Sequence, residues 1–179
     1  MKVIYCFIGK ARHGKDTAAE LTTEILRERG FPGSVEHKSF AKLLKEQAKM
    51  LGWDGEKDER GRTLLQELSA PVKRYHGQNY YAEYVLNEIR ADKNKDSVYL
   101  ITDMRYKNEY FLYRDLKDED IEVKFIKIVR PETNEWRSPL TLEQQNHQSE
   151  VDLDDVDFKV VLKNSGTLHD LKTKLEKVV

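Results

Sequence analysis

The residues with the clearest chemical meaning form one short segment near the start of the chain, residues 9–17 (GKARHGKDT). Gly9, Gly14 and Lys15 match the pattern G-x-x-x-x-G-K. Glycines let backbone N–H groups turn inward around phosphate oxygens, and the N-terminus of a following helix adds partial positive charge. We therefore predict a nucleotide-binding phosphate loop, in which Lys15 supplies a positive charge to the β- and γ-phosphates. The predicted contacts are Gly9, Ala11, Arg12, His13, Gly14, Lys15, Asp16 and Thr17.

The loop departs from its usual pattern at the residue after the lysine. Asp16 stands where a serine or threonine hydroxyl usually contacts Mg²⁺. Two interpretations stay open. In the first, Asp16 holds Mg²⁺ directly or through water, while Thr17 reaches the α-phosphate. In the second, Asp16 only adds favourable negative charge at the N-terminus of a helix.

A second pair of charged residues, Asp103 and Arg105, follows the apolar run of residues 97–102 (SVYLIT). Ligands of open α/β sheets bind outside the carboxyl ends of the strands, so we expect this pair to face the phosphates. An aspartate there can hold Mg²⁺ or accept the proton of the attacking oxygen, and an arginine can clamp a phosphate. The alternative is a structural Asp–Arg ion pair.

The elements that must position these residues alternate along the chain. Apolar, β-prone runs predict strands at residues 3–8, 34–40, 97–102, 122–129 and 158–162. Helical spacing predicts helices at residues 15–29, 41–51, 63–77, 80–91, 106–116 and 167–178, with Pro71 as a point where the third could break. This alternation indicates an α/β, P-loop NTPase-like fold: a parallel sheet of about five strands flanked by helices.

Two polar segments lack clear periodicity. Residues 54–61 (DGEKDERG) are predicted to be a loop, and residues 131–155 a long loop or lid. Lids commonly close on substrate and exclude water. Within the second segment, His147 and Glu150 lie three positions apart and indicate either a metal-ligand pair or a structural part of the lid, with no third ligand evident.

Composition excludes several classes of protein. The 179 residues fit one domain, and 31 basic against 32 acidic residues give no whole-molecule attraction to nucleic acid or anionic membrane. The single cysteine, Cys6, excludes an intrachain disulfide and a multi-cysteine zinc site, and its apolar surroundings predict a buried strand residue. The longest apolar run, residues 3–8, is too short for a membrane span. We expect a soluble, cytoplasmic protein without nucleic-acid or membrane partners.

Missing motifs narrow the choice among proteins with a phosphate loop. A GTPase would carry N-K-x-D, whereas residues 94–96 (NKD) have the wrong spacing, and the transporter signature L-S-G-G-Q is absent. A small domain with a helical insert after the second strand and a long lid is instead typical of a small-molecule kinase.

Several short motifs then occur in a fixed order: residues 14–17 (GKDT), 39–45 (SFAKLLK), 64–66 (LLQ), 101–109 (ITDMRYKNE), 128–130 (IVR), 147–150 (HQSE) and 164–168 (NSGTL). In these motifs the chain resembles the phage-type deoxynucleoside monophosphate kinases over nearly all of its length. The resemblance implies transfer of the γ-phosphoryl group of ATP to a deoxynucleoside 5′-monophosphate in the host cytoplasm, often by a homodimer. The chain departs from the family at residues 68–71 (LSAP), where the family commonly reads L-G-T followed by an arginine.

The resemblance also implies how a single kinase domain is divided. The core would comprise residues 1–40, 95–130 and 156–179, the helical substrate-binding region residues 41–92, and the lid residues 131–155. Phosphoryl transfer depends on positioning and charge neutralisation, so several separate cations are required. We predict ATP as the donor and Mg²⁺ as the cofactor, with Asp16 and Asp103 as metal ligands. The predicted catalytic residues are Lys15, Asp103, Arg105 and Arg130.

The acceptor and the adenine base need residues of their own. The predicted acceptor-binding residues are Lys42, Trp53, Gln66, Arg74, Arg105 and Arg137. The cations of this set would bind phosphate, Trp53 would offer a stacking face beside Tyr80 and Tyr81, and Gln66 would read a base edge. Asn164 follows the last strand, near the place where P-loop kinases hold adenine. Plain alternatives stay open: surface ion pairs for the cations, packing for the aromatic residues and a turn for Asn164.

Two rival functions remain. The first is another small-molecule kinase of the same architecture, such as a dephospho-CoA or phosphomevalonate kinase. The second is a module that binds ATP without phosphorylating anything. Intact Lys15, Asp103 and Arg105 argue against the second, because such a module has little need of charges on the acceptor side.

Overall fold

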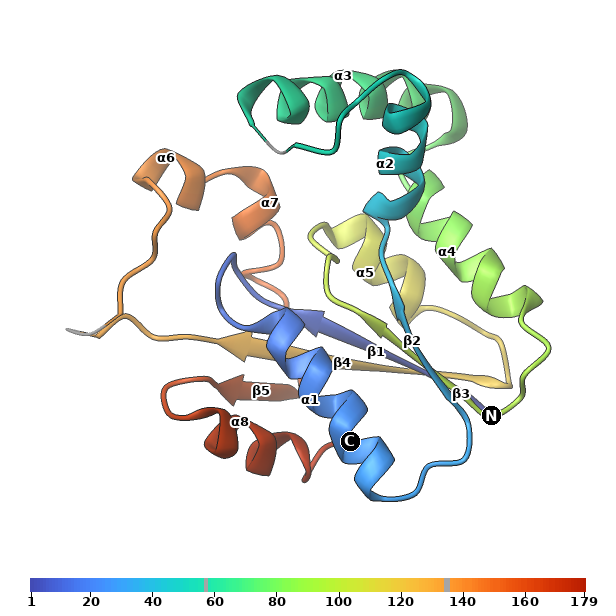
Figure 1. Cartoon of the computed structure of the whole chain (residues 1–179), viewed down its shortest axis with the longest axis vertical. Helices are drawn as coiled ribbons and strands as arrows, with labels where there is room; N and C mark the ends of the chain where they lie inside the picture. Colours follow the sequence, from blue (N-terminus) through green and yellow to red (C-terminus); the bar gives the residue numbers. More distant parts are fainter. Residues whose placement is uncertain (57, 134–135) are drawn as a thin grey trace. The chain divides into compact units, whose positions relative to one another are not determined.

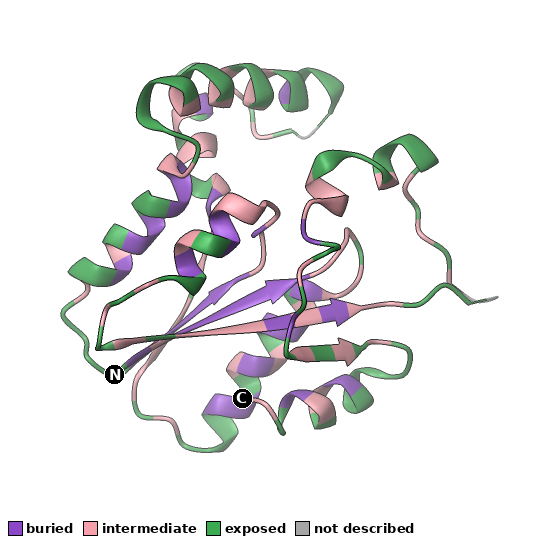
Figure 2. Cartoon of the chain, turned by 180° about the vertical axis from the view of Figure 1, so that it is seen from behind, coloured by how far each residue is buried: buried purple, intermediate pink, exposed green. Residues whose placement is uncertain are grey.

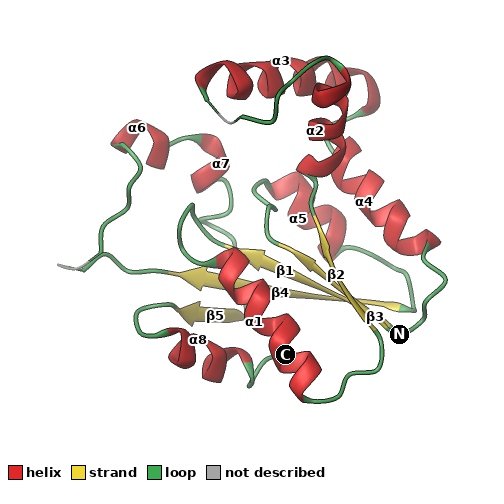
Figure 3. Cartoon of the chain, viewed as in Figure 1, coloured by secondary structure: helices red, strands yellow, loops and turns green. Residues whose placement is uncertain are grey.

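The computed structural model describes residues 1–56, 58–133 and 136–179, and its central feature is a five-stranded sheet (Figures 1 and 3). The strands are β1 (Lys2–Ile8), β2 (Ser34–Lys38), β3 (Ser97–Ile101), β4 (Ile121–Val129) and β5 (Val160–Lys163). Their order in the sheet is β2-β3-β1-β4-β5. β1 runs parallel to β3 and β4, and β4 runs parallel to β5. The predicted α/β fold is confirmed.

Helices cover both faces of this sheet. On one face, α1 (Lys15–Glu28) and α8 (Leu168–Leu175) pack on alternate residues of the strands (Figure 1). That core consists of Tyr5, Phe7, Ala18, Ala19, Ile25, Leu26, Val98, Leu100, Ile126, Ile128, Leu171 and Leu175. On the other face lies α5 (Lys107–Arg114), whose Tyr110 ring centre is 4.8 Å from that of Phe125. Strands buried on both faces read as continuous apolar runs, which is why the sequence predicted them well.

The central strands are the most deeply buried part of the molecule (Figure 2). Cys6 on β1 is fully buried, as predicted, and burial followed by the negative charge of Asp103 raises the pKa of its thiol. This thiol therefore stays protonated and packs as a small apolar residue.

Residues 38–93 form a second compact unit, distinct from the unit of residues 1–37 and 94–179. It contains α2 (Ala41–Met50), α3 (Glu59–His76) and α4 (Tyr80–Ala91). In the ranges that the structure describes, no helix combines the length and the apolar character needed to cross a membrane.

Helix α3 corrects two predictions. It begins inside the predicted loop 54–61, because the Asp58 carboxylate accepts a hydrogen bond from the Gly61 N–H at 2.7 Å and caps the helix. Lys57 of that loop lies outside the described residues. The helix also continues through Pro71. Pro71 and Glu67 are both exposed, so water can satisfy the carbonyl that loses its N–H partner.

The predicted lid, residues 131–155, contains two one-turn helices that its sequence did not reveal: α6 (Leu142–Gln145) and α7 (Gln148–Val151). Thr141 caps the first in a reciprocal box with Gln144, and the His147 side chain caps the second. Each helix is only four residues long, too short for apolar periodicity to show, and only the capping pattern T-x-x-Q could have signalled α6. Asn134 and Glu135 of the predicted lid lie outside the described residues.

Candidate active site

The carboxyl ends of four neighbouring strands place the candidate active-site residues along one edge of the sheet. β1 leads into the loop 9–14, β3 into residues 102–105, β4 into Arg130 and β5 into Asn164. Because β1 lies between β3 and β4, the loop has Asp103 and Arg105 on one side and Arg130 on the other. The site therefore forms from segments that are distant in sequence but end at the same edge.

Both glycines of the phosphate loop occupy positions where a side chain would collide. A Cβ on Gly9 would lie 2.4 Å from the Ile128 carbonyl oxygen. Gly14 has φ of 98°, in the left-handed region, and its Cβ would lie 2.5 Å from Nδ2 of Asn164. That Asn164 amide donates a hydrogen bond to the His13 carbonyl at 3.0 Å. The loop can adopt this shape only with glycine at both positions.

Gly14→Ala tests this packing. We expect it to destabilise the fold by roughly 1–3 kcal/mol, because alanine is strained at this φ and displaces the Asn164 amide. We also expect AMPPNP, a nonhydrolysable ATP analogue, to bind about tenfold more weakly, which corresponds to about 1.4 kcal/mol. Thermal melting and titration calorimetry measure the two effects.

Gly30→Ala is the matched control. Gly30 also has a positive φ, of 70°, but a Cβ there meets nothing within 4 Å. This variant should lose stability through backbone strain alone and bind AMPPNP normally. Equal AMPPNP affinity in the two variants would contradict the packing account of Gly14.

Lys15 is buried at the first turn of α1 and is held by the loop itself. Its Nζ donates hydrogen bonds to the carbonyl oxygens of Gly9 at 2.7 Å and Lys10 at 2.9 Å. Burial, and then the positive charge of Arg105, lower the pKa of Lys15 to about 8. Such an ammonium lacks sufficient compensating negative charge, so an arriving phosphate would stabilise its charged form.

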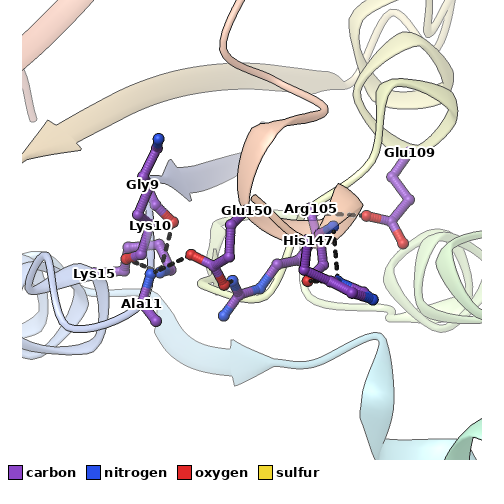
Figure 4. Close-up of polar contacts among 9 residues, drawn as sticks. Gly9, Lys10, Ala11, Lys15, Arg105, Glu109, His147 and Glu150 are labelled. Atoms are coloured by element: carbon purple, nitrogen blue, oxygen red, sulfur yellow. Dashed lines mark hydrogen bonds and ion pairs between the residues drawn. The ribbon is translucent and has the colours of Figure 1, made fainter. Parts of the chain in front are cut away.

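Arg105 reaches the phosphate loop through a carboxylate that sequence analysis did not place there (Figure 4). One oxygen of Glu150 accepts a hydrogen bond from the Ala11 N–H at 2.7 Å, and the other pairs with Nη1 of Arg105. The Glu150 side chain is only 8% exposed. The backbone N–H of Arg105 is in turn fixed by the buried Glu109 carboxylate at 2.8 Å. A buried carboxylate thus lies against the loop amide and the arginine that phosphates would contact.

The opposite side of the loop gathers His13, Arg130 and Trp136. Nδ1 of His13 accepts a hydrogen bond from the Arg130 N–H at 3.2 Å. The Arg130 guanidinium carbon lies 4.6 Å from the centre of the Trp136 ring, and the His13 and Trp136 rings meet edge-on at 5.9 Å. Arg130 is therefore stacked on an aromatic surface beside the loop, where a guanidinium can hold its charge at low solvation cost.

The hydrogen bond that His13 accepts and the burial of its ring predict a lowered pKa for this residue. Its Nδ1 accepts a hydrogen bond only while the ring is neutral, and burial lowers its pKa below the ordinary 6.5. The unfolded chain then binds the proton more tightly, so the free energy of unfolding should fall as pH decreases from 6.5 through the lowered pKa. NMR titration, with the signal assigned through His13→Gln, should give a value below 6.5. A value at or above 6.5 would contradict this contact.

The predicted magnesium ligands are Asp16 and Asp103, and two carboxylates alone would leave most coordination positions of the ion to other ligands. Asp16 is in the first turn of α1 beside Lys15, and the negative charges of Asp16 and Asp103 both act to raise the pKa of Lys15. Within the described ranges, no three His, Cys, Asp or Glu residues are grouped to hold a metal. Mg²⁺ typically uses one or two carboxylates, waters and the substrate phosphates, so two carboxylates fit this ion.

Two cavities open beside the phosphate loop, and Glu150 and His13 line both. The first, of about 240 Å³, is also lined by Gly9, Met104 and Arg105. The second, of about 320 Å³, is also lined by Arg130 and Trp136. The loop therefore has space on the Arg105 side and on the Arg130 side.

The remaining predicted site residues differ in exposure and in the unit of the chain to which they belong. Arg12, Asp16 and Arg137 are exposed, and Thr17 is half-buried on α1. Four predicted acceptor-binding residues belong to the unit of residues 38–93: Lys42, Trp53, Gln66 and Arg74. Of these, Trp53 is half-buried and its indole N–H donates to the Glu56 carbonyl at 2.9 Å. That contact favours the packing interpretation of Trp53.

Sequence analysis missed the roles of Glu109, Trp136 and Glu150. Glu150 was identified only as a member of the motif HQSE and as a partner of His147. His147 instead caps α7, and its Nδ1 accepts a hydrogen bond from the Ser149 N–H at 3.3 Å. The contact of Glu150 with Ala11 joins residues 139 positions apart, and no periodicity or local motif signals such a pair.

Comparisons with known proteins rest on structure alone. No protein-family model matches the chain, and no curated protein matches it. The APS kinase CysC of Mycobacterium tuberculosis, solved with AMPPNP and APS, has a TM-score of 0.55 to this chain at 15% identity, over 99% of this chain and 96% of that one. This likeness shows that the chain shares the α/β fold of that structure. A second structure, APE1195, has a TM-score of 0.48 at 17% identity, over 98% of this chain and 93% of that one.

Proposed function

We propose that this chain transfers the γ-phosphoryl group of ATP to a deoxynucleoside 5′-monophosphate and gives the diphosphate. One observation carries the proposal: two separate anion-binding groups meet at a single carboxylate. The Ala11 N–H in the phosphate loop and the Arg105 guanidinium after β3 both bind Glu150. The two groups therefore lie within the span of one small anion. Phosphoryl transfer needs this proximity, since donor and acceptor phosphates must approach each other in line.

The residues on either side of this point have complementary tasks. Lys15 and the loop N–H groups would bind the β- and γ-phosphates of ATP, and Arg105 would bind the acceptor phosphate. Asp103 would accept the proton of the attacking oxygen. It lies two residues before Arg105, and its negative charge acts on Lys15. Arg130 would neutralise charge from the opposite side of the loop. Asp16 and Asp103 would hold Mg²⁺, which when bound neutralises phosphate charge.

The base and sugar of the acceptor would be recognised by the helical unit of residues 38–93. Its candidates are Lys42 and Arg74 for the phosphate and Gln66 for the base edge, all three exposed. The identification of a deoxynucleoside monophosphate rests on the resemblance of the motifs. A cytoplasmic location and a homodimer belong to the same proposal.

The test is an ADP-release assay with ATP and Mg²⁺ against a panel of acceptors. The panel contains the four deoxynucleoside monophosphates, 5-hydroxymethyl-dCMP, the ribonucleotides, dephospho-CoA, phosphomevalonate and APS, the second ligand of the similar kinase complex. We expect turnover with a subset of the deoxynucleotides, which would also give the base preference.

The other outcomes of the panel separate the rival functions. Turnover only with dephospho-CoA, phosphomevalonate or APS would keep the kinase and replace the acceptor. If no acceptor of the panel gave ADP release while AMPPNP still bound, a nucleotide-binding module would be favoured. Failure to bind AMPPNP, both alone and together with every acceptor of the panel, would overturn the phosphate-loop assignment itself.

A further inference from the structure

The Glu150 carboxylate is bound by two groups that suit a phosphate anion. Its carboxylate accepts from the Ala11 N–H at 2.7 Å, pairs with Arg105, and lines both cavities beside the loop (Figure 4). With only 8% of the side chain exposed, it has replaced water by protein partners. A loop N–H and a guanidinium are also the partners that phosphate oxygens prefer. Phosphate and Glu150 therefore compete for the same groups.

The residues after Glu150 hold this carboxylate in place. Asp152 accepts a hydrogen bond from the Lys107 N–H at 2.7 Å, and Asp155 pairs with Nζ of the same lysine at 2.6 Å. Asp154 pairs with Nζ of Lys10 in the phosphate loop at 3.0 Å. The four acidic residues within the segment 150–155 thus bind the phosphate loop and the segment after β3 at the same time. We call Glu150 seated when its carboxylate is bound to the Ala11 N–H and to Arg105. The contacts between opposite charges favour this state whenever no phosphate is present.

We propose that Glu150 is an internal anion that blocks the donor and acceptor phosphate sites together, and that its displacement by one substrate opens the site for the other. The inference rests on the proposed function, because it assumes that the loop and Arg105 bind two different phosphates. One carboxylate holds a group from each site, so neither phosphate can bind fully while Glu150 is seated. Once the first phosphate has displaced it, the second no longer has to.

The consequence is positive coupling between the two substrates. When most molecules are seated, each substrate alone binds more weakly than it would to an open site. The factor is the ratio of seated molecules to molecules in which Glu150 has left Ala11 and Arg105. The second substrate escapes this factor, and by linkage the gain is the same in either order of binding. Couplings of this kind are typically about 5- to 150-fold. We therefore expect AMPPNP to bind at least fivefold more tightly in the presence of an accepted monophosphate than alone.

Glu150→Gln tests the inference, with Glu143→Gln as the matched control. Glutamine keeps the shape of the side chain but cannot form the ion pair with Arg105. Glu143→Gln makes the same chemical change at an exposed glutamate of α6, which belongs to none of the contacts that hold Glu150. Titration calorimetry would measure the Kd of AMPPNP with Mg²⁺ for wild type and both variants, alone and with each of the four deoxynucleoside monophosphates.

We expect Glu150→Gln to tighten AMPPNP binding at least fivefold when no monophosphate is present, and to leave the affinity with monophosphate unchanged. The coupling would disappear in this variant and persist in Glu143→Gln. Equal or weaker binding of AMPPNP by Glu150→Gln would overturn the inference and leave the proposed function intact. Equal tightening in both variants would overturn it too, because the effect would then be general electrostatics.

Failure of the proposed function gives a different result. If neither wild type nor Glu150→Gln bound AMPPNP, the phosphate-loop assignment and the inference would fall together. If Glu150→Gln bound AMPPNP alone and wild type bound it only together with a monophosphate, the inference would hold in its strongest form, with the seated carboxylate excluding the nucleotide.

Discussion

Lys15→Met is expected to lower kcat/KM for phosphoryl transfer by about 10³-fold or more, which corresponds to about 4 kcal/mol of transition-state stabilisation. The ammonium group of Lys15 is buried and already aimed into the loop by the carbonyls of Gly9 and Lys10. A preorganised charge in a poorly solvated site is worth far more than the same charge in water, because it needs no reorganisation during the reaction. Methionine keeps the buried stem and removes the charge together with the two hydrogen bonds to these carbonyls. ADP release with the best acceptor of the panel measures the loss.

The fold of this variant should survive. Burial lowers the pKa of Lys15 to about 8, whereas the unfolded chain has the ordinary value of 10.5. At pH 7 the proton is therefore bound more tightly by the unfolded chain, and the charged lysine costs the folded state free energy. We expect Lys15→Met to melt at the same temperature as wild type or higher.

Lys172→Met, which removes a lysine paired with Glu28 at 2.7 Å, is the control for Lys15→Met and should keep normal kcat/KM. Normal turnover in Lys15→Met would exclude the loop as the donor site. A collapse of its melting temperature would show that the lysine has a structural role instead.

Arg105→Ala is expected to lower kcat/KM by roughly 10²-fold, or about 2–3 kcal/mol. The Arg105 side chain is 28% exposed and directed at the phosphate loop, while the buried Glu109 fixes its backbone. Its loss removes positive charge from the acceptor phosphate and from the transition state. We expect both a higher KM for the acceptor and a lower kcat. A change in the KM for ATP alone would instead assign Arg105 to the donor.

The control for Arg105→Ala is Arg114→Ala on α5. Arg114 pairs with Asp115 at 2.7 Å in an exposed position, so its removal should change kcat/KM less than twofold. The affinity of AMPPNP gives a second readout. Because Arg105→Ala also removes the ion-pair partner of Glu150, AMPPNP binding alone should not weaken. Loss of AMPPNP affinity would show that Arg105 acts mainly on the donor.

The fold and the phosphate loop were predictable because their signals are local. β1 and β3 are buried on both faces and read as unbroken apolar runs, and α1 begins directly after the loop. The loop places its glycines, its lysine and the start of a helix within nine consecutive residues. Adjacent residues share a backbone, so their spacing in sequence fixes their spacing in space within narrow limits.

Helix boundaries were less predictable where a single side chain decides them. α3 begins at the carboxylate of Asp58, inside a segment whose polarity predicted a loop. It passes Pro71 because the lost hydrogen bond lies on an exposed face, and exposure is a property of packing. In both places the local signal was real, but the surroundings determined which outcome had the lower free energy.

The sequence by itself determined that this protein has a parallel sheet, a phosphate loop with Lys15 at its centre, and charged residues after the third strand. Only the tertiary structure decided what surrounds that lysine. The Asn164 amide fixes the carbonyl of His13, and the Glu150 carboxylate joins Ala11 to Arg105. These contacts bring together strand ends and α7, segments far apart in the chain. Their partners are selected by the geometry of the sheet edge and by the free-energy cost of leaving buried polar groups unpaired, and neither is written in local spacing.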